Sequence, residues 1–131
     1  MKLPEYITCP VSALPKKGTQ ADQYLIELII NEQVDESKFA EMFNSNQRSP
    51  LQKLRGPIWQ YWRILDVTCP KTGNIIARKL DPRHKSGDEN LDRQARKERE
   101  REYTRDSLKQ ALDEVKRLPK AQGVYLKARE E

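Results

Sequence analysis

The chain has 131 residues, of which 36% are hydrophobic and 34% charged, and its formal net charge at pH 7 is +5. This small apolar fraction can close one modest core, which argues against a large buried active-site cleft. No apolar run reaches the roughly 20 residues of a membrane helix, and residues 1–6 lack the apolar centre of a signal peptide, so we expect a cytoplasmic protein.

The positive charge is concentrated in the middle of the chain. Residues 47–80 contain seven Lys and Arg residues and a single acid, Asp66. After residue 80, basic and acidic residues are nearly balanced. The central excess suits an anionic partner such as nucleic acid, but a surface excess of this size is also common on proteins that bind no nucleic acid.

Four stretches are predicted along the chain. Residues 1–18 are rich in proline and are predicted to form an extended arm with turns. Residues 19–80 are predicted to form the core domain. Residues 81–88 are predicted to be a linker, and residues 89–131 a charged C-terminal helix with a tail.

The core domain is predicted to begin with two helices. The first starts near Thr19, a favourable N-cap, and carries an apolar stripe at helical spacing, although its β-branched residues leave a strand as the alternative. The second follows the cap Asp35 and covers residues 36–43. Asn44 then interrupts the pattern, because asparagine tolerates the left-handed conformation that ends helices.

A third helix and a hairpin complete the predicted domain. The helix covers residues 48–55, since Pro50 is acceptable only in a first turn and Gly56 with the following proline ends it. Two β-prone runs, residues 61–67 and 74–80, flank a turn that contains proline and glycine. This arrangement predicts a β-hairpin.

Three helices followed by a hairpin make this sequence similar to a winged helix-turn-helix. The residues that carry the resemblance are Phe39, Ala40, Phe43, Asn44, Leu51 and Leu54. Ala40 takes the small position of the second helix, Asn44 stands where glycine is usual, and the apolar positions of the third helix come later than in that family. The chain most resembles the small winged-helix proteins of bacteriophages and mobile elements, which implies an α+β, mainly helical fold that binds double-stranded DNA.

The resemblance implies that the third helix enters the major groove and that the hairpin acts as the wing. Arg48 and Gln52 have donor and acceptor groups that can read base edges, while Lys53 and Arg55 suit guanine or phosphate. Lys and Arg side chains on a wing can bind the DNA backbone or enter the minor groove, where the electrostatic potential is negative. The predicted DNA-binding residues are Arg48, Ser49, Gln52, Lys53, Arg55, Lys71, Thr72, Arg78 and Lys79.

Catalysis and metal binding are not indicated by the sequence. The single histidine, His84, has no Cys or Ser partner in a catalytic motif, and the chain has no glycine-rich phosphate loop. Cys9 and Cys69 with one histidine fall short of the four ligands of a structural zinc site. We therefore expect no enzyme, no cofactor and no metal, and two reduced cysteines.

The aromatic residues beside the hairpin, Trp59, Tyr61 and Trp62, have two interpretations. An exposed Trp can stack on a base or anchor a protein partner. In a small domain, however, such residues usually seal the core. We expect the second role, with one of the two Trp residues partly exposed.

The C-terminal helix is predicted to run over residues 89–118 and to end at Pro119. Its first half has almost no apolar face, whereas its second half carries an apolar stripe. The stripe packs either on the core domain or against the same stripe of a second chain. In the second case a homodimer forms through Leu108, Leu112 and Val115, and its two-fold symmetry would suit a palindromic DNA site; the sequence favours neither case over the other.

Two functions follow from these features. The first is DNA binding, in transcriptional control or in DNA processing by a mobile element. The alternative is a protein–protein adaptor or inhibitor that acts on a host nucleic-acid enzyme; an RNA-binding module ranks lower, because the aromatic sheet motif of common RNA-binding modules is absent. An adaptor is expected to expose an apolar patch around Trp59 or Leu112, and a DNA-binding protein a positive face of Arg48, Gln52, Lys53 and Lys71.

Overall fold

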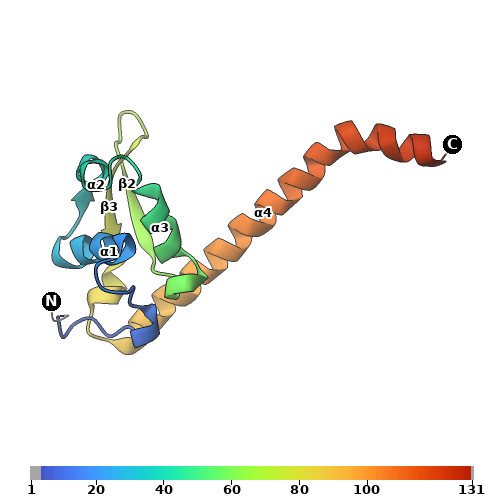
Figure 1. The fold of residues 1–131 in the computed structure, drawn as a ribbon. Coiled ribbons are helices and arrows are strands. Elements are labelled where there is room, and N and C mark those ends of the chain that lie inside the picture. The colour runs from blue at the N-terminus through green and yellow to red at the C-terminus, as the bar shows by residue number, and fades with distance from the viewer. Residues whose placement is uncertain (1–3, 131) are drawn as a thin grey trace. The chain divides into compact units, whose positions relative to one another are not determined.

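The structure, a computed structural model, describes residues 4–130, with side chains as far as Val115. In that part of the chain the protein is α+β and mainly helical, with four α-helices and a three-stranded antiparallel sheet (Figure 1). The chain up to Glu100 forms one compact unit, and the chain from Arg101 onward forms a second. None of the described helices combines the length and the apolar character needed to cross a membrane.

The first helix, α1 (Gln20–Ile30), begins where the sequence predicts. Thr19 is its N-cap, and the Thr19 hydroxyl oxygen accepts a hydrogen bond from the backbone amide of Asp22 at 3.3 Å. Leu25 and Leu28 are buried on the face that packs into the core. The apolar spacing therefore predicted a helix correctly, and the strand alternative is wrong.

The next two helices, α2 (Glu36–Met42) and α3 (Arg48–Arg55), also match the prediction closely. Between them, Asn44 and Ser45 adopt positive φ angles of 51° and 65°. Asn44 interrupts the helical pattern after α2 for the expected reason, because its short polar side chain tolerates the left-handed backbone conformation. Pro50 lies in the first turn of α3, as predicted.

Strands β2 (Ile64–Thr68) and β3 (Ile75–Leu80) form the predicted hairpin. The structure adds a short strand that was not predicted, β1 (Val34–Asp35), which pairs with β3. The sheet order is β1-β3-β2, and all pairings are antiparallel. Two residues are too few to show the alternation from which strands are predicted. In the chain order α1-β1-α2-α3-β2-β3, the short 3-10 helix η2 (Pro57–Trp59) separates α3 from the hairpin.

The core is sealed by aromatic side chains. Tyr24 stacks on Phe39 with 3.8 Å between ring centroids, and Phe43 lies 5.9 Å from the Tyr24 ring. Trp62 is fully buried, whereas Trp59 is only partly buried against the core. The expected sealing role is confirmed for Trp62, and Trp59 is the partly exposed member of the pair.

The segments predicted as an arm and a linker are packed against the core. Ala13 is buried, and its carbonyl accepts a hydrogen bond from Trp62 Nε1 at 2.8 Å. The stretch 81–88 contains a short 3-10 helix, η3 (Pro82–Lys85), whose His84 is fully buried. Proline and glycine indicated irregular backbone correctly. They did not indicate its burial, because burial depends on partners that are distant in sequence.

The last helix, α4 (Glu89–Glu130), begins where predicted but continues past Pro119, which was predicted to end it. A proline removes one amide donor, yet its fixed φ is compatible with a helix, so a single proline need not end one. In the described part of the apolar stripe, Leu108, Leu112 and Val115 are 59%, 52% and 58% exposed. These three side chains of the stripe are therefore largely exposed.

Candidate nucleic-acid interface

Helix α3 has a polar side that faces solvent and an apolar side that faces the core. At about 100° per residue, Arg48, Gln52 and Lys53 fall on one side of the helix, and all three side chains are exposed. Ser49 lies on the same side and is partly buried. The buried side consists of Pro50, Leu51 and Leu54. Periodicity thus placed the predicted base-reading residues on the accessible surface.

The hairpin exposes two further predicted residues at its tip, Lys71 and Thr72. The backbone amide of Cys69 donates to the carbonyl of Asn74 at 2.8 Å, which closes the turn. Hydrogen bonds from the Thr72 hydroxyl, and from the backbone amides of Thr72 and Lys71, lower the pKa of the Cys69 thiol. On the return strand, Lys79 is partly buried. The tip is therefore a tightly hydrogen-bonded turn that exposes Thr72 and Lys71, and Lys71 forms no ion pair with a described residue.

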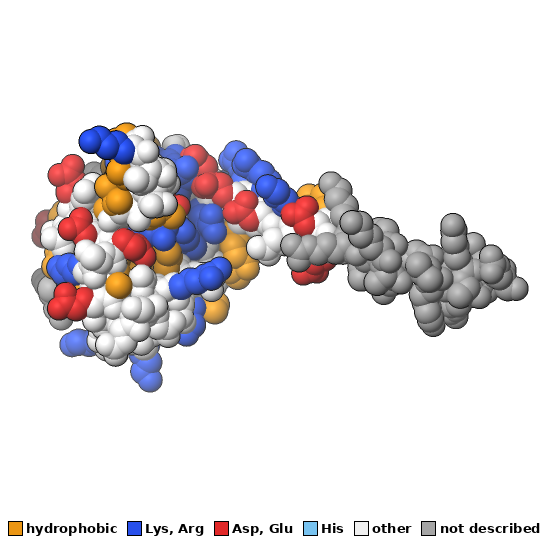
Figure 2. All heavy atoms as spheres, turned by 90° about the horizontal axis from the view of Figure 1, so that it is seen from above, with side chains coloured by type: hydrophobic (Ala, Val, Ile, Leu, Met, Phe, Trp, Pro, Cys, Tyr) orange, Lys and Arg blue, Asp and Glu red, His pale blue; other side chains and the backbone are white. Residues whose placement is uncertain are grey.

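The surface that contains these residues is mixed in charge. Seen from above, Asp and Glu side chains lie among the Lys and Arg side chains (Figure 2). Cations that are paired with acids contribute little net field to an approaching polyanion. The charge available to such a partner therefore comes from cations that make no ion pair with a described residue, which include Arg48, Lys53 and Lys71.

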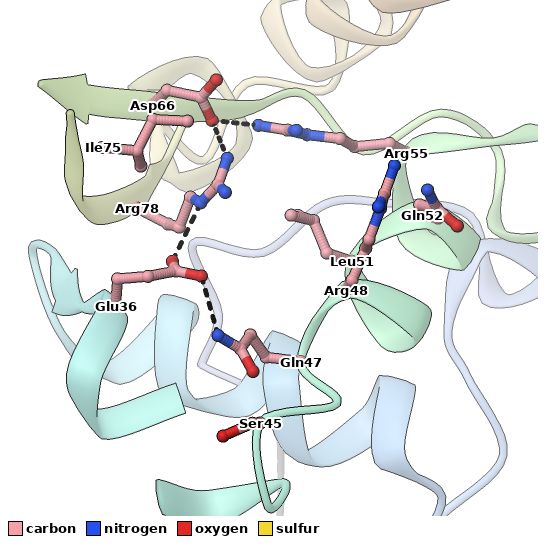
Figure 3. A pocket seen from close by; sticks show the side chains of 10 residues that line it. All are labelled: Glu36, Ser45, Gln47, Arg48, Leu51, Gln52, Arg55, Asp66, Ile75 and Arg78. Carbon is pink, nitrogen blue, oxygen red and sulfur yellow. Dashed lines mark hydrogen bonds and ion pairs between the residues drawn. The ribbon is translucent and has the colours of Figure 1, made fainter. Parts of the chain in front are cut away.

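Arg55 and Arg78, both among the predicted DNA-binding residues, instead form ion pairs within the domain. Arg55 Nη2 donates to Asp66 Oδ1 at 2.6 Å, and Arg78 Nη1 donates to the same oxygen. Arg78 Nε also donates to Glu36 Oε2 at 3.0 Å. These bonds join α2, α3, β2 and β3, and we call Glu36, Arg55, Asp66 and Arg78 the clasp (Figure 3).

Pairing within the clasp favours the charged forms of Asp66 and Arg78. Burial alone raises the pKa of the Asp66 carboxyl, but the hydrogen bonds and charges of Arg55 and Arg78 outweigh it, so this pKa is lowered. Burial also lowers the pKa of the Arg78 guanidinium, but Glu36 and Asp66 overcome it, so this pKa is raised. Each partner therefore favours the ionised form of the other at neutral pH.

A hollow of about 480 Å³ lies between α2, α3 and the hairpin. The clasp runs along one side of it, and Arg48 and Gln52 extend from α3 (Figure 3). Gln47 Nε2 donates to Glu36 Oε1 at 3.2 Å, while Gln47 Oε1 is buried with no hydrogen-bond partner among the described residues. Chemically, the hollow offers more hydrogen-bond donors than acceptors, which suits an anionic group.

Among the clasp residues, only Asp66 gave a signal in the sequence for its pairing. It is the single acid in residues 47–80, and such isolation indicates that neighbouring cations compete for it. Glu36 gave no comparable signal, because it lies 42 residues from its partner Arg78. Sequence reasoning missed Glu36 for that reason, and it assigned Arg55 and Arg78 to DNA without seeing their internal partners.

His84 belongs to a buried polar cluster at the start of α4. Its Nδ1 donates to Asp92 Oδ1 at 2.7 Å, and its Nε2 accepts from the backbone amide of Arg63 at 3.0 Å. Arg96 donates from Nε to Asp92 Oδ2 at 2.9 Å and lies 4.0 Å above the Trp62 ring. Burial lowers the pKa of His84 more than Asp92 raises it. The imidazole is therefore neutral, and both of its nitrogens are engaged in structural bonds.

Comparison with known proteins gives no relative for this chain: no family model, no curated protein and no solved structure matches it. Within the described residues, no group of three or more His, Cys, Asp and Glu side chains is placed to hold a metal ion. Cys9 and Cys69 are both free thiols.

Proposed function

We propose that the protein binds double-stranded DNA through a winged helix-turn-helix, with α3 as the recognition helix and the β2–β3 hairpin as the wing. The observation that carries this proposal is the chain order α1-β1-α2-α3-β2-β3, with an exposed polar side on the helix that precedes the hairpin. A major groove admits one helix, and its base edges carry a distinct donor and acceptor pattern for each base pair. The DNA-bound protein acts in transcriptional control or DNA processing.

The roles of the nine predicted residues divide by their surroundings. Arg48 and Gln52 are exposed on α3 and suit base edges, and the Arg48 guanidinium also suits a phosphate. Lys53 and Lys71 suit phosphates, to which serine and threonine hydroxyls also bind. Arg55 and Arg78 act differently, because the clasp engages them. Within the clasp they position the hairpin against α3. The other predicted DNA-binding residues, which contact the DNA backbone, are Ser49, Thr72 and Lys79.

The clasp changes the expected dependence of binding on salt. A cation neutralised by a neighbouring carboxylate releases fewer counterions from DNA than a free one. Four cations of the predicted site are then left to contact phosphates, namely Arg48, Lys53, Lys71 and Lys79. A plot of log K against log salt concentration is expected to have a slope of about −3 to −4.

Titration of a fluorescent mixed-sequence duplex, followed by anisotropy at several salt concentrations, tests this proposal. Lys53→Gln is expected to weaken binding and to make the slope shallower by about one unit. Lys17→Gln is the matched control, because Lys17 is an exposed lysine that precedes α1 and lies outside the predicted interface. Absence of binding at low salt, or equal losses in the two variants, contradicts the proposal.

The alternative function, a protein–protein adaptor or inhibitor of a nucleic-acid enzyme, is favoured by exposed apolar side chains. Val11 and Ile58 are 85% and 62% exposed, and Ile58 adjoins the partly buried Trp59. Exposed apolar side chains of this kind are typical of protein-binding surfaces when they are contiguous. A protein that binds no duplex at low salt would favour this alternative. The homodimer through the α4 stripe stays a prediction.

A further inference from the structure

The hollow between α2, α3 and the hairpin contains an excess of positive charge. Its walls include three arginines, Arg48, Arg55 and Arg78, and two carboxylates, Glu36 and Asp66. The clasp pairs the carboxylates with Arg55 and Arg78. Arg48 is left over, and it lies on the same side of α3 as Arg55 because seven residues make about two helical turns. One guanidinium in the wall therefore has no counter-charge among the described residues.

The clasp also leaves hydrogen-bond donors unused. Arg78 donates to carboxylates through Nε and Nη1, and Arg55 donates through Nη2 to Asp66 and to the carbonyl of Ile64. A guanidinium has more N–H groups than either residue uses here. Since both side chains are held in place by these bonds, their remaining N–H groups are fixed donors in the wall of the hollow.

Several of the hydrogen-bond acceptors in the hollow already have donors within the protein. Asp66 Oδ1 accepts from two arginines, and the two carboxylate oxygens of Glu36 accept from Arg78 and Gln47. Gln47 Oε1 is a buried acceptor without a partner in the described part of the chain. A ligand that matches this wall has several oxygen atoms that accept hydrogen bonds from the arginines. It can also have one hydroxyl that donates a hydrogen bond to Gln47 Oε1.

We propose that the hollow is a binding site for a phosphate group, held by Arg48 and by the unused N–H groups of Arg55 and Arg78. The planar fork of arginine matches the oxygens of phosphate, and such charge-assisted bonds are stronger than neutral ones. This inference goes beyond the proposed function, because the site would also bind free hydrogen phosphate in the absence of DNA. Free hydrogen phosphate and a phosphate of the DNA backbone present the same oxygen acceptors, so competition between them identifies the source.

Titration of inorganic phosphate into the full-length, ¹⁵N-labelled protein at constant ionic strength tests the proposal. Saturable shifts are expected in the amide and arginine side-chain signals around residues 45–55, 66 and 78. Arg48→Gln is expected to raise the dissociation constant about tenfold. Lys17→Gln is the matched control, because it removes an exposed cation that neither lines the hollow nor belongs to the predicted interface, and it should leave the dissociation constant within about twofold.

Addition of a DNA duplex to the phosphate-saturated protein distinguishes the sources. Displacement of phosphate by the duplex assigns the site to a backbone phosphate, and simultaneous binding assigns it to a free one; both results support the inference. Shifts that do not saturate, or that persist unchanged in Arg48→Gln, overturn it. Duplex binding without a phosphate site overturns this inference alone, whereas a phosphate site without duplex binding overturns only the proposed function.

Discussion

At the scale of single residues, Asp66 connects side chains from different elements. It accepts hydrogen bonds from Arg55 at the end of α3 and from Arg78 on β3. An isolated ion pair on a surface contributes little to stability. Here the side chains of the two arginines are only 20% and 12% exposed. Loss of the carboxylate would leave two partly buried cations near each other without compensation.

Asp66→Asn is therefore expected to lower the free energy of unfolding by about 1–2 kcal/mol. This is less than the usual loss when a fully buried charged partner is removed, because the Asp66 side chain is 40% exposed. Urea denaturation followed by Trp fluorescence measures the change. Glu41→Gln, at an exposed acid of α2 that forms no ion pair with a described residue, is the control and should change stability by less than about 0.5 kcal/mol. Equal stability of the two variants would contradict the proposed role of the clasp.

His84 gives the protein an expected dependence of stability on pH. Burial lowers the pKa of His84, so the folded protein binds this proton less readily than the unfolded chain does. The contribution of His84 to the free energy of unfolding is complete when the pH is above the histidine pKa of the unfolded chain, about 6.5. It is lost as the pH falls below that pKa, and the free energy of unfolding then decreases by at most about 1.4 kcal/mol per pH unit. The pKa of Asp92, its partner, is also lowered, because His84 and Arg96 outweigh its burial.

Urea denaturation at pH values from 7.5 to 5 measures this slope. Because the chain has one histidine, the imidazole signal in an NMR titration assigns the change to His84 without ambiguity. A free energy of unfolding that stays constant between pH 7 and pH 5, or an imidazole that titrates near 6.5 in the folded protein, is the contrary result.

At the scale of elements, local chemistry decided what could be predicted. Thr19 capped α1, Pro50 fixed the start of α3, and the turn between β2 and β3 contained proline and glycine. Each of these signals depends on residues close in the chain. Strand β1 was missed because its two residues gain their conformation from pairing with β3. Similarly, the burial of Asp92 and Arg96 could not be predicted, because charged residues are buried only when distant partners satisfy them.

The same distinction applies to the candidate site. Arg48, Gln52 and Lys53 were placed on the exposed side of α3 because helical periodicity alone defines that side. The state of Arg55 and Arg78 depends on Glu36 and Asp66, which belong to other elements. Charge counting therefore overestimated the number of cations that are available to a partner.

At the scale of the whole molecule, the compact unit holds the proposed interface in place from two sides. The clasp joins α3 to the hairpin, and Arg99 Nε on α4 donates to the carbonyl of Arg55 at the end of α3 at 3.1 Å. Trp62 connects the N-terminal segment to the core through its bond to Ala13. An interface that is ordered before binding loses less conformational entropy when a partner docks. We therefore expect α3 and the hairpin to bind DNA as one rigid surface.

The most direct test of DNA binding by α3 and the hairpin is a map of amide shifts when a DNA duplex is added to the ¹⁵N-labelled protein. The perturbed signals are expected to lie in α3, from Arg48 to Lys53, and at the hairpin tip around Lys71 and Thr72, in fast or intermediate exchange together. Signals around Val11 and Ile58 should remain in place. Perturbation centred on Val11 and Ile58, or on α4 with α3 unaffected, would contradict the claim that α3 and the hairpin form the DNA-binding surface.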